Sequence, residues 1–490
     1  MSQFYTSVDH FALVPALMLA LFGCAVLLFD FFVFPAPRQR KWLVLLLALG
    51  IGFAALGLVR QYAFLKSEGL AEFTAFRGTL TIDGFAIFFN GIFLAASLLV
   101  ALVSYRYLEI EGEHHGEYYG LILLANCGMY FLATGTDLVT LFVGLELMAI
   151  CFYIMVGFLR LDRRSNEAAI KYLLLGAFSS GFLAYGFSLM YGLAGSTRLA
   201  DITAALAARP PWDPLVFLAM ATTAVGLFFK VSLVPFHMWA PDAYEGAPTT
   251  VTAYLSVASK AASFALLVRI FLGPLAGTRA VWQPLLAAVA VATLTVGNLA
   301  AVTQTNVKRL LAYSSISHAG YILLGLVAGN PTGIKGIAVY LLVYTFMNLG
   351  AFLVLIALRR QQILGEELDD LSGLMHKSPA HAILMLIFLL SLAGIPPTAG
   401  FIAKYYIFWA LIQAGQYWLA AIAAAYVAVA VYYYFRIVRS MFVSELSERE
   451  PLASSFGLRL ALGVTGVLTL AIGVHPEPWL ELAQNSVLLR

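Results

Sequence analysis

The sequence has few charged residues. Asp, Glu, Lys and Arg make up 11% of its 490 residues, whereas a soluble domain carries roughly a quarter. Hydrophobic residues account for 61% of the chain, and the mean hydropathy is +0.88. This composition excludes a soluble globular protein. It indicates an all-α integral membrane protein, because long apolar runs cross a bilayer as helices.

Blocks of like charge are also missing. The formal net charge is only +3, and no run of basic or acidic residues appears. A nucleic-acid partner and a polybasic surface tail are therefore not expected, and the membrane itself is the expected surrounding of the chain.

Motifs that bind metals or nucleotides are absent too. Cys24, Cys127 and Cys151 lie singly in apolar runs, with no C-x-x-C pair and no Cys/His cluster, which argues for core positions rather than iron–sulfur or zinc ligands. No G-x-G-x-x-G follows a strand, and there is no phosphate loop, so this chain is expected to bind neither NADH nor flavin. The first apolar run is followed by PRQRK instead of a small-residue cleavage site, which favours a first span over a signal peptide.

Long apolar runs dominate the chain. A span needs about 20 apolar residues, and on that criterion roughly fourteen runs are present. No separate soluble domain fits between the runs. Four connections are longer than the rest: 61–80, 194–213, 359–379 and 440–456. The runs start near residues 11, 41, 82, 117, 137, 168, 215, 249, 282, 306, 333, 380, 417 and 457.

Basic residues are distributed unevenly over the connections. Of the 29 Lys and Arg residues, about 17 fall on the odd-numbered connections, about nine on the even-numbered ones and about three within spans, and the richer side is cytoplasmic by the positive-inside rule. With fourteen spans, both termini are predicted on the opposite, periplasmic side.

Four ionisable residues lie deep within apolar runs. They are Lys230, Lys260 and Lys404, with Glu146 in LFVGLELMAI as the matching acid. A charge at bilayer depth costs at least ~2.5 to 3.5 kcal/mol unless it pairs or contacts internal water. Structural ion pairs that fix helix packing are one explanation, and a functional path is the other.

The spacing of these residues indicates two related halves. Lys230 and Lys404 each follow a glycine by four residues, with proline within eight residues on one side. A polar residue precedes each of them by a similar distance. Glu146 lies 84 residues before Lys230, and His318 lies 86 residues before Lys404. The second half is offset from the first by five runs. Because five is an odd number, the second half is inverted relative to the first in the membrane. Such inverted repeats are typical of transporters, whose working site lies near the midplane. Chance similarity is the alternative.

Prolines interrupt two of the expected spans. Pro396 and Pro397 supply no N–H to the carbonyls of Leu392 and Ala393, and Pro235 interrupts a second helix beside Lys230. Broken backbone at membrane depth is tolerated only where it is buried in protein or lines a watery cavity. Each break is therefore predicted to be a hydrated place beside a lysine.

Hydroxyl and imidazole groups recur at helical spacing near two of these residues. A lysine with hydroxyls at three- and four-residue steps favours a hydrated relay on one face, although small polar residues also mediate helix packing. The first group surrounds Lys260 and the second contains His318: Thr252, Ser256, Ser259 and Ser263, then Ser314, His318 and Tyr321.

These groups suit proton chemistry. A lysine in a low-dielectric interior loses affinity for its proton, and a neighbouring carboxylate restores it. We therefore expect Glu146 and Lys230 to form a pair whose separation controls when the lysine releases its proton. Their distance is not determined by the sequence.

Three segments resemble a known family. VPFHMWAPDAYEGAPTTVTAYLS, KRLLAYSSISHAGYILLG and SLAGIPPTAGFIAKYYIF are similar to the signature segments of the antiporter-like membrane subunits of respiratory complex I, and the similarity covers about residues 80–440. Within this family, the YEGAP segment and the lysine at position 404 are similar to the corresponding features of subunit N of bacterial NADH:quinone oxidoreductases. In subunit M and in multisubunit sodium/proton antiporters, the position of Lys404 is usually glutamate.

The resemblance implies a fold and a set of roles. It implies two inverted five-helix bundles, spans 4 to 8 and 9 to 13, with broken helices 7 and 12. Its domains are residues 1–115, 116–275, 276–442 and 443–490. The implied site has five residues. Glu146 is the acidic partner, Lys230 the central lysine and Lys260 the connecting lysine. His318 is the bridge between the halves, and Lys404 is the exit-side lysine.

The resemblance also implies the setting. The chain is expected in the bacterial inner membrane, as a subunit of a proton-translocating enzyme, beside other complex I membrane subunits and lipids. It is expected to bind no cofactor itself, with NADH, FMN, iron–sulfur clusters and quinone in partner subunits. An Mrp-type cation/proton antiporter, a membrane subunit of an energy-converting hydrogenase and a purely structural scaffold remain as alternatives.

Overall fold

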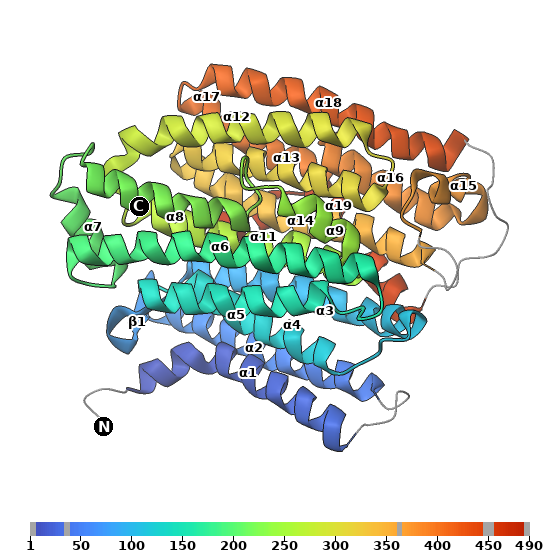
Figure 1. Cartoon of the computed structure of the whole chain (residues 1–490), viewed down its shortest axis with the longest axis horizontal. Helices are drawn as coiled ribbons and strands as arrows, with labels where there is room; N and C mark the ends of the chain where they lie inside the picture. The colour runs from blue at the N-terminus through green and yellow to red at the C-terminus, as the bar shows by residue number, and fades with distance from the viewer. Residues whose placement is uncertain (1–5, 34–39, 360–364, 444–454, 485–490) are drawn as a thin grey trace.

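The computed structural model describes residues 6–33, 40–359, 365–443 and 455–484. Residues 37–39 of PRQRK, residues 360–364, most of the expected 440–456 connection and both chain termini lie outside these ranges. Within them the chain is almost entirely helical, and the helices run side by side as one bundle (Figure 1).

The first part of the chain contains three long helices and a small hairpin. The antiparallel strands pair Glu72 with Asp83 and Ala75 with Leu80. The elements are α1 (Ser7–Phe32), α2 (Lys41–Ser67), β1 (Glu72–Ala75), η2 (Phe76–Gly78), β2 (Leu80–Asp83) and α3 (Gly84–Glu111).

The central part contains an interrupted helix and a helix with a π-helical turn, η3. Its elements are α4 (Glu117–Thr134), α5 (Leu138–Val156), α6 (Arg163–Ala194), α7 (Leu199–Ala207), α8 (Pro214–Lys230), α9 (Trp239–Gly246), α10 (Thr249–Tyr254), η3 (Leu255–Ser259) and α11 (Lys260–Leu272).

The last part contains a second interrupted helix. Its elements are η4 (Ala276–Thr278), α12 (Arg279–Thr303), α13 (Val307–Ala328), α14 (Pro331–Leu358), η5 (Leu368–Leu371), α15 (Leu374–Lys377), α16 (Pro379–Ala393), α17 (Ala399–Gln413), α18 (Tyr417–Val443), α19 (Phe456–Val474) and α20 (Glu477–Gln484).

Eleven helical segments in the described part of the chain are long and apolar enough to cross a membrane. They confirm a multi-pass membrane protein. The other three expected runs correspond to α4, α8 and α16, of which α8 and α16 are apolar but shorter helices that end at the two chain breaks.

Three of the expected long connections are more ordered than the sequence indicated. The 61–80 connection begins inside α2 and contains β1, and the 194–213 connection contains α7, whose Leu199, Ile202 and Leu206 are buried at helical spacing. The 359–379 connection contains η5 and α15. These elements are short, so their periodic signal is weak beside the long apolar runs.

Polar side chains fix where many helices begin. Asp83, Asp137, Asp162 and Asn306 each accept a hydrogen bond from a backbone N–H in the first turn of the following helix. Such caps satisfy donors that have no partner within the helix. They lie at the ends of the bundle, where the chain turns.

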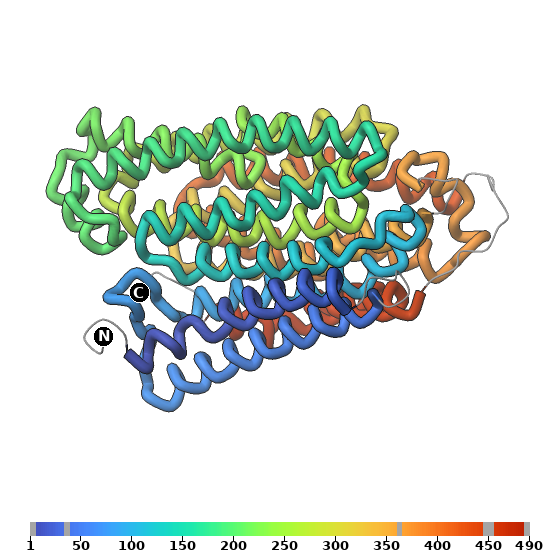
Figure 2. Tube along the Cα trace, turned by 60° about the horizontal axis from the view of Figure 1, so that its bottom comes forward, coloured from blue at the N-terminus to red at the C-terminus, as the bar shows by residue number. Residues whose placement is uncertain are grey.

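The centre of the bundle is formed by α14. Every residue in its most apolar 18-residue window is buried, compared with 33% in α1 and 22% in α18. The C-terminal α19 packs against α14, α17 and α3, so a late helix of the sequence lies beside an early one (Figure 2). The hairpin and α7 lie at one end of the bundle and α15 at the other (Figure 1).

Candidate functional site

The four predicted basic residues all lie inside the protein. Lys230, Lys260, His318 and Lys404 are each between 2% and 4% exposed. Each comes from a different helix, so their neighbours depend on how the helices pack.

Lys404 occupies the break that separates α16 from α17. Its ammonium donates to the carbonyl oxygens of Leu392 (3.0 Å) and Ala393 (2.8 Å), the two carbonyls that the prolines leave without a helical partner. Gly394 has φ +85°, and a Cβ there would meet Lys404 Cδ at 2.8 Å. The glycine therefore allows both the turn and the close passage of the lysine.

Lys230 lies at the other break and is the last residue of α8. Its ammonium donates to the hydroxyl of Tyr153 on α5 (3.1 Å) and lies 5.4 Å from the centre of that ring. The carbonyl of Phe229 accepts from the indole of Trp239 (2.8 Å). Lys230 thus precedes its break, whereas Lys404 follows its own.

Glu146 is not in direct contact with Lys230. Its carboxylate accepts a hydrogen bond from Ser180 on α6 (2.5 Å). The ion pairs of the described residues do not include Glu146, Lys230, Lys260 or Lys404. The expected Glu146–Lys230 contact is therefore not made in this conformation.

Lys260 begins α11, directly after the π-helical turn. Its ammonium donates to the carbonyl of Ser315 (2.7 Å) and to the hydroxyl of the same residue. The ring centre of Tyr344 lies 5.9 Å away. A π turn shifts the helical phase. The hydroxyls around Lys260 accordingly have separate partners. Thr252 donates to the carbonyl of Tyr244, and Ser256 accepts a hydrogen bond from Asn348.

His318 lies in a cluster of phenol groups. Its ring nitrogens lie 2.7 Å from the hydroxyl of Tyr340 and 3.2 Å from that of Tyr434. Tyr434 also hydrogen-bonds Ser314. Two residues of the predicted polar face on α13 therefore share one partner on α18.

One face of α13 connects the second half of the site. Ser315 contacts Lys260, His318 follows one turn later, and the ring of Tyr321 lies 5.0 Å from the ammonium of Lys404. Residues three apart lie on one helical face. The helix thus brings Lys260, His318 and Lys404 into one row.

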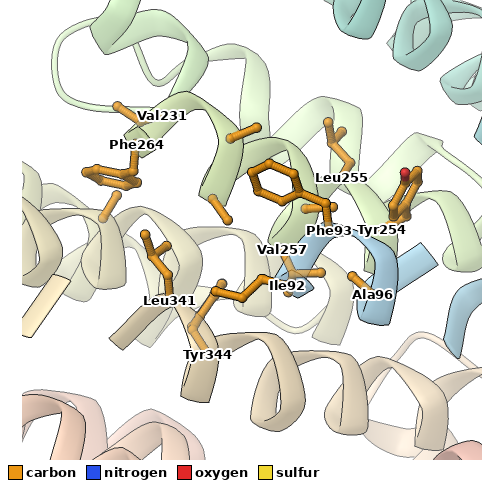
Figure 3. Close-up of a cluster of buried hydrophobic side chains, with 14 of the residues drawn as sticks. Ile92, Phe93, Ala96, Val231, Tyr254, Leu255, Val257, Phe264, Leu341 and Tyr344 are labelled. Carbon is orange, nitrogen blue, oxygen red and sulfur yellow. The ribbon is translucent and has the colours of Figure 1, made fainter. Parts of the chain in front are cut away.

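Buried apolar side chains pack directly after Lys230 in the chain. Val231, which follows Lys230, points toward Phe264, one turn beyond Lys260, in a cluster completed by residues such as Leu341 and Ile92 (Figure 3). The buried hydroxyls of Ser232 and Ser263 have no hydrogen-bond partner among the described residues. The first lysine and the row on α13 are therefore not joined by side-chain hydrogen bonds here.

The sequence did not identify several of these partners. Tyr153, Tyr340 and Tyr434 lie in ordinary apolar or aromatic runs, where a single hydroxyl gives no pattern. Two signals were available: Tyr153 lies seven residues, or two turns, after Glu146, and Ser315 lies three residues before His318, each pair on one helical face.

A polar cavity of about 160 Å³ lies at the α15 end of the bundle. Two buried ion pairs line it: Arg359 with Glu111 (2.6 Å) and Lys308 with Glu366 (2.9 Å). Lys308 lies seven residues before Ser315 on α13, so the cavity lies two turns from the contact of Lys260.

Metal coordination finds no support in the residues described. No three His, Cys, Asp or Glu side chains among them lie close enough together to hold a metal ion. Cys127 and Cys151 are buried and unpaired, and Cys24 is exposed and unpaired.

The chain is similar to a known protein family and to known sequences and structures. Residues 135–430 match the family described as NADH:quinone oxidoreductase/Mrp antiporter, transmembrane. The chain is 73% identical over 487 residues to NADH-quinone oxidoreductase subunit N 2 of Solibacter usitatus, with 99% of each chain covered.

Solved structures give the same fold. A chain of respiratory complex I from Thermus thermophilus with bound aureothin superimposes with a TM-score of 0.80 at 33% identity, covering 96% of this chain and 99% of that one. A chain of the Mrp complex from Dietzia sp. DQ12-45-1b has a TM-score of 0.83 at 22% identity, covering 98% and 97%, and shows the fold alone. The chain belongs to the NADH:quinone oxidoreductase/Mrp antiporter transmembrane family, within the group of NADH-quinone oxidoreductase N subunits.

Proposed function

We propose that the chain is a proton-translocating subunit of the membrane arm of a bacterial NADH:quinone oxidoreductase. Glu146, Lys230, Lys260, His318 and Lys404 carry protons through it, while NADH oxidation and quinone reduction occur in partner subunits. The enzyme activity belongs to the complex, and this chain contributes translocation.

One observation carries the proposal: the buried lysines Lys230, Lys260 and Lys404 have only neutral hydrogen-bond partners. Their ammonium groups donate to a phenol, a serine and two backbone carbonyls. A structural ion pair needs a carboxylate to offset the cost of burying the charge. Lysines held by neutral oxygen atoms are free to change protonation state, which suits a relay better than a scaffold.

The same proposal extends to topology. Fourteen spans result if α4, α8 with α9, and α16 with α17 cross the membrane together with the eleven longer segments. Spans 4 to 8 then correspond to α4–α11 and spans 9 to 13 to α12–α18, as inverted repeats within residues 116–275 and 276–442. Residues 1–115 and 443–490 flank them. In this arrangement the α15 end is cytoplasmic and both termini are periplasmic.

The proposed surroundings follow from the relatives. The chain lies in the inner membrane against lipids and neighbouring membrane subunits of the complex. NADH, FMN, iron–sulfur clusters and quinone are bound by partner subunits. Protons are the only substrate assigned to this chain, and nucleic acid has no role.

Two other redox or transport assemblies are less well supported. An Mrp-type antiporter shares the fold, but the 73% identity to a subunit N and the presence of Lys404 favour the quinone oxidoreductase. A membrane subunit of an energy-converting hydrogenase has no observation of its own in its favour.

Proton pumping by the reconstituted complex tests the proposal. Lys230→Ala and Lys404→Ala are expected to lower pumping by roughly tenfold or more, since a positioned proton-transfer group contributes about 10²-fold or more, while native gels show normal assembly. Lys66→Ala, at an exposed position in the last turn of α2, is the control and should pump like the parent. Normal stoichiometry in the two assembled site variants would contradict the proposal.

A further inference from the structure

Tyr153 is the neutral partner of Lys230, and its position relative to Glu146 is informative. Both residues belong to α5, two turns apart, and both face α6. The phenol accepts from Lys230 at 3.1 Å, and Glu146 accepts from Ser180 at 2.5 Å. Each of the two charged groups therefore has its own neutral partner.

The packing of α6 shows how far apart these two contacts are. Gly176 lies beside the hydroxyl of Tyr153, and Ser180, four residues later, lies beside Glu146. Four residues correspond to about 6 Å along a helix, a distance similar to the length of a lysine side chain. The two partners therefore contact positions on α6 that are about one helical turn apart.

The site is built to admit the phenol. A Cβ at Gly176 would lie 2.0 Å from the hydroxyl oxygen of Tyr153 and 2.7 Å from its Cζ. The edge of the ring packs against Tyr172 at 4.7 Å between centres, and Tyr172 in turn stacks on Trp239 at 4.4 Å. Tyr153 is thus held in one orientation, aimed at the end of α8.

We propose that Tyr153 is a positioning residue that holds Lys230 away from Glu146. In the conformation described here the phenol takes the ammonium, and the carboxylate is taken by Ser180. Proton passage through the first half of the chain then requires Lys230 to exchange Tyr153 for Glu146 and to return. This inference rests on the proposed function and deepens it.

Without the phenol, Lys230 has no competing partner and stays with Glu146. Tyr153→Phe keeps the aromatic packing and removes only the hydroxyl. We expect about a tenfold loss of pumping in the reconstituted complex, the size that follows from losing one hydrogen bond to a charged group. Tyr172→Phe removes a neighbouring hydroxyl that does not contact Lys230 and is the matched control, with unchanged pumping.

A double-mutant cycle separates positioning from packing. Glu146→Gln removes the carboxylate that competes for Lys230, so adding Tyr153→Phe to it should change pumping by less than about twofold. If Tyr153 acted only through packing, the two losses would multiply. Multiplicative losses, or wild-type pumping by assembled Tyr153→Phe, would overturn the inference.

Gly176→Ala provides an independent variant in which the phenol is kept but displaced. It should lower pumping as Tyr153→Phe does and show the same dependence on Glu146. If assembled Gly176→Ala pumps like the parent, the inference is also overturned. Loss of pumping in Lys230→Ala with none in Tyr153→Phe would reject the inference alone, whereas normal pumping in Lys230→Ala rejects the proposed function.

Discussion

At the scale of single residues, the partner of a buried cation decides what that cation does. Lys404 takes two carbonyls that the break leaves free, and Lys230 takes a phenol. By contrast, Lys308 pairs with Glu366 and donates to the carbonyl of Ala247. Lys308 thus has a carboxylate partner, whereas Lys230 and Lys404 have only neutral oxygen partners.

Acid sensitivity is expected from a histidine outside the spans. His114 is buried between α3 and α4, with Nε2 3.1 Å from the hydroxyl of Tyr119. Burial, and then the nearby Arg40, lower the pKa of His114 from 6.5 to about 4. The unfolded chain binds this proton below pH 6.5 and the folded chain does not, so stability falls as the pH drops from 6.5 toward 4.

His114→Gln should reduce that acid sensitivity. The variant keeps a polar side chain near Tyr119 but has no group that titrates in this range. Thermal melting of the purified protein in detergent at pH 7.5 and pH 5 is the measurement. We expect the melting temperature of the parent to fall further than that of the variant. Equal falls would show that His114 does not contribute.

At the scale of elements, the two halves of the second interrupted helix, α16 and α17, cross very closely. In the second break, the N–H of Gly400 donates to the hydroxyl of Ser391 at 3.0 Å. A Cβ at Gly400 would lie only 1.7 Å from the carbonyl oxygen of Ser391. Position 400 therefore cannot accept a side chain unless α17 moves away from α16.

Gly400→Ala is expected to displace α17 and with it Lys404. Overpacking of this kind costs about 1 to 3 kcal/mol. The expected result is a lower melting temperature of the purified protein together with reduced pumping. Gly463→Ala on α19, where no atom lies within 4 Å of the added Cβ, is the control. Parental stability in Gly400→Ala would contradict the crossing seen here.

At the scale of the whole molecule, ion pairs at the bundle ends join distant parts of the sequence. Arg359 binds Glu111 through two hydrogen bonds of 2.6 and 2.8 Å. This pair links the end of α14, the central helix, to the end of α3. The two side chains are 13% and 10% exposed, so neither charge is well solvated without the other.

Removing one partner should weaken this link. Arg359→Gln leaves Glu111 largely buried and unpaired, which costs about 3 to 5 kcal/mol. Melting of the purified protein should therefore occur at a lower temperature, and adding Glu111→Gln should restore part of the loss. Arg106→Gln breaks an exposed pair with Glu109 on α3 and should have almost no effect. A larger loss in the double variant than in Arg359→Gln would be inconsistent with this account.

The sequence by itself determined the class of protein, the positions of the helices and the residues that can carry charge inside them. The expected starts near residues 117, 215 and 380 agree with α4, α8 and α16 within a few residues. The prolines predicted both breaks and the two carbonyls that Lys404 binds. These features are local, because a bilayer requires long apolar helices and a proline acts on its own turn.

Only the tertiary structure decided which groups meet. Tyr153 comes to Lys230 from 77 residues away, Ser315 to Lys260 from 55 and Tyr434 to His318 from 116. The same packing gives Glu146 and Lys230 separate partners, Ser180 and Tyr153. Such contacts depend on helix–helix packing and rotation, and neither leaves a periodic signal in the sequence.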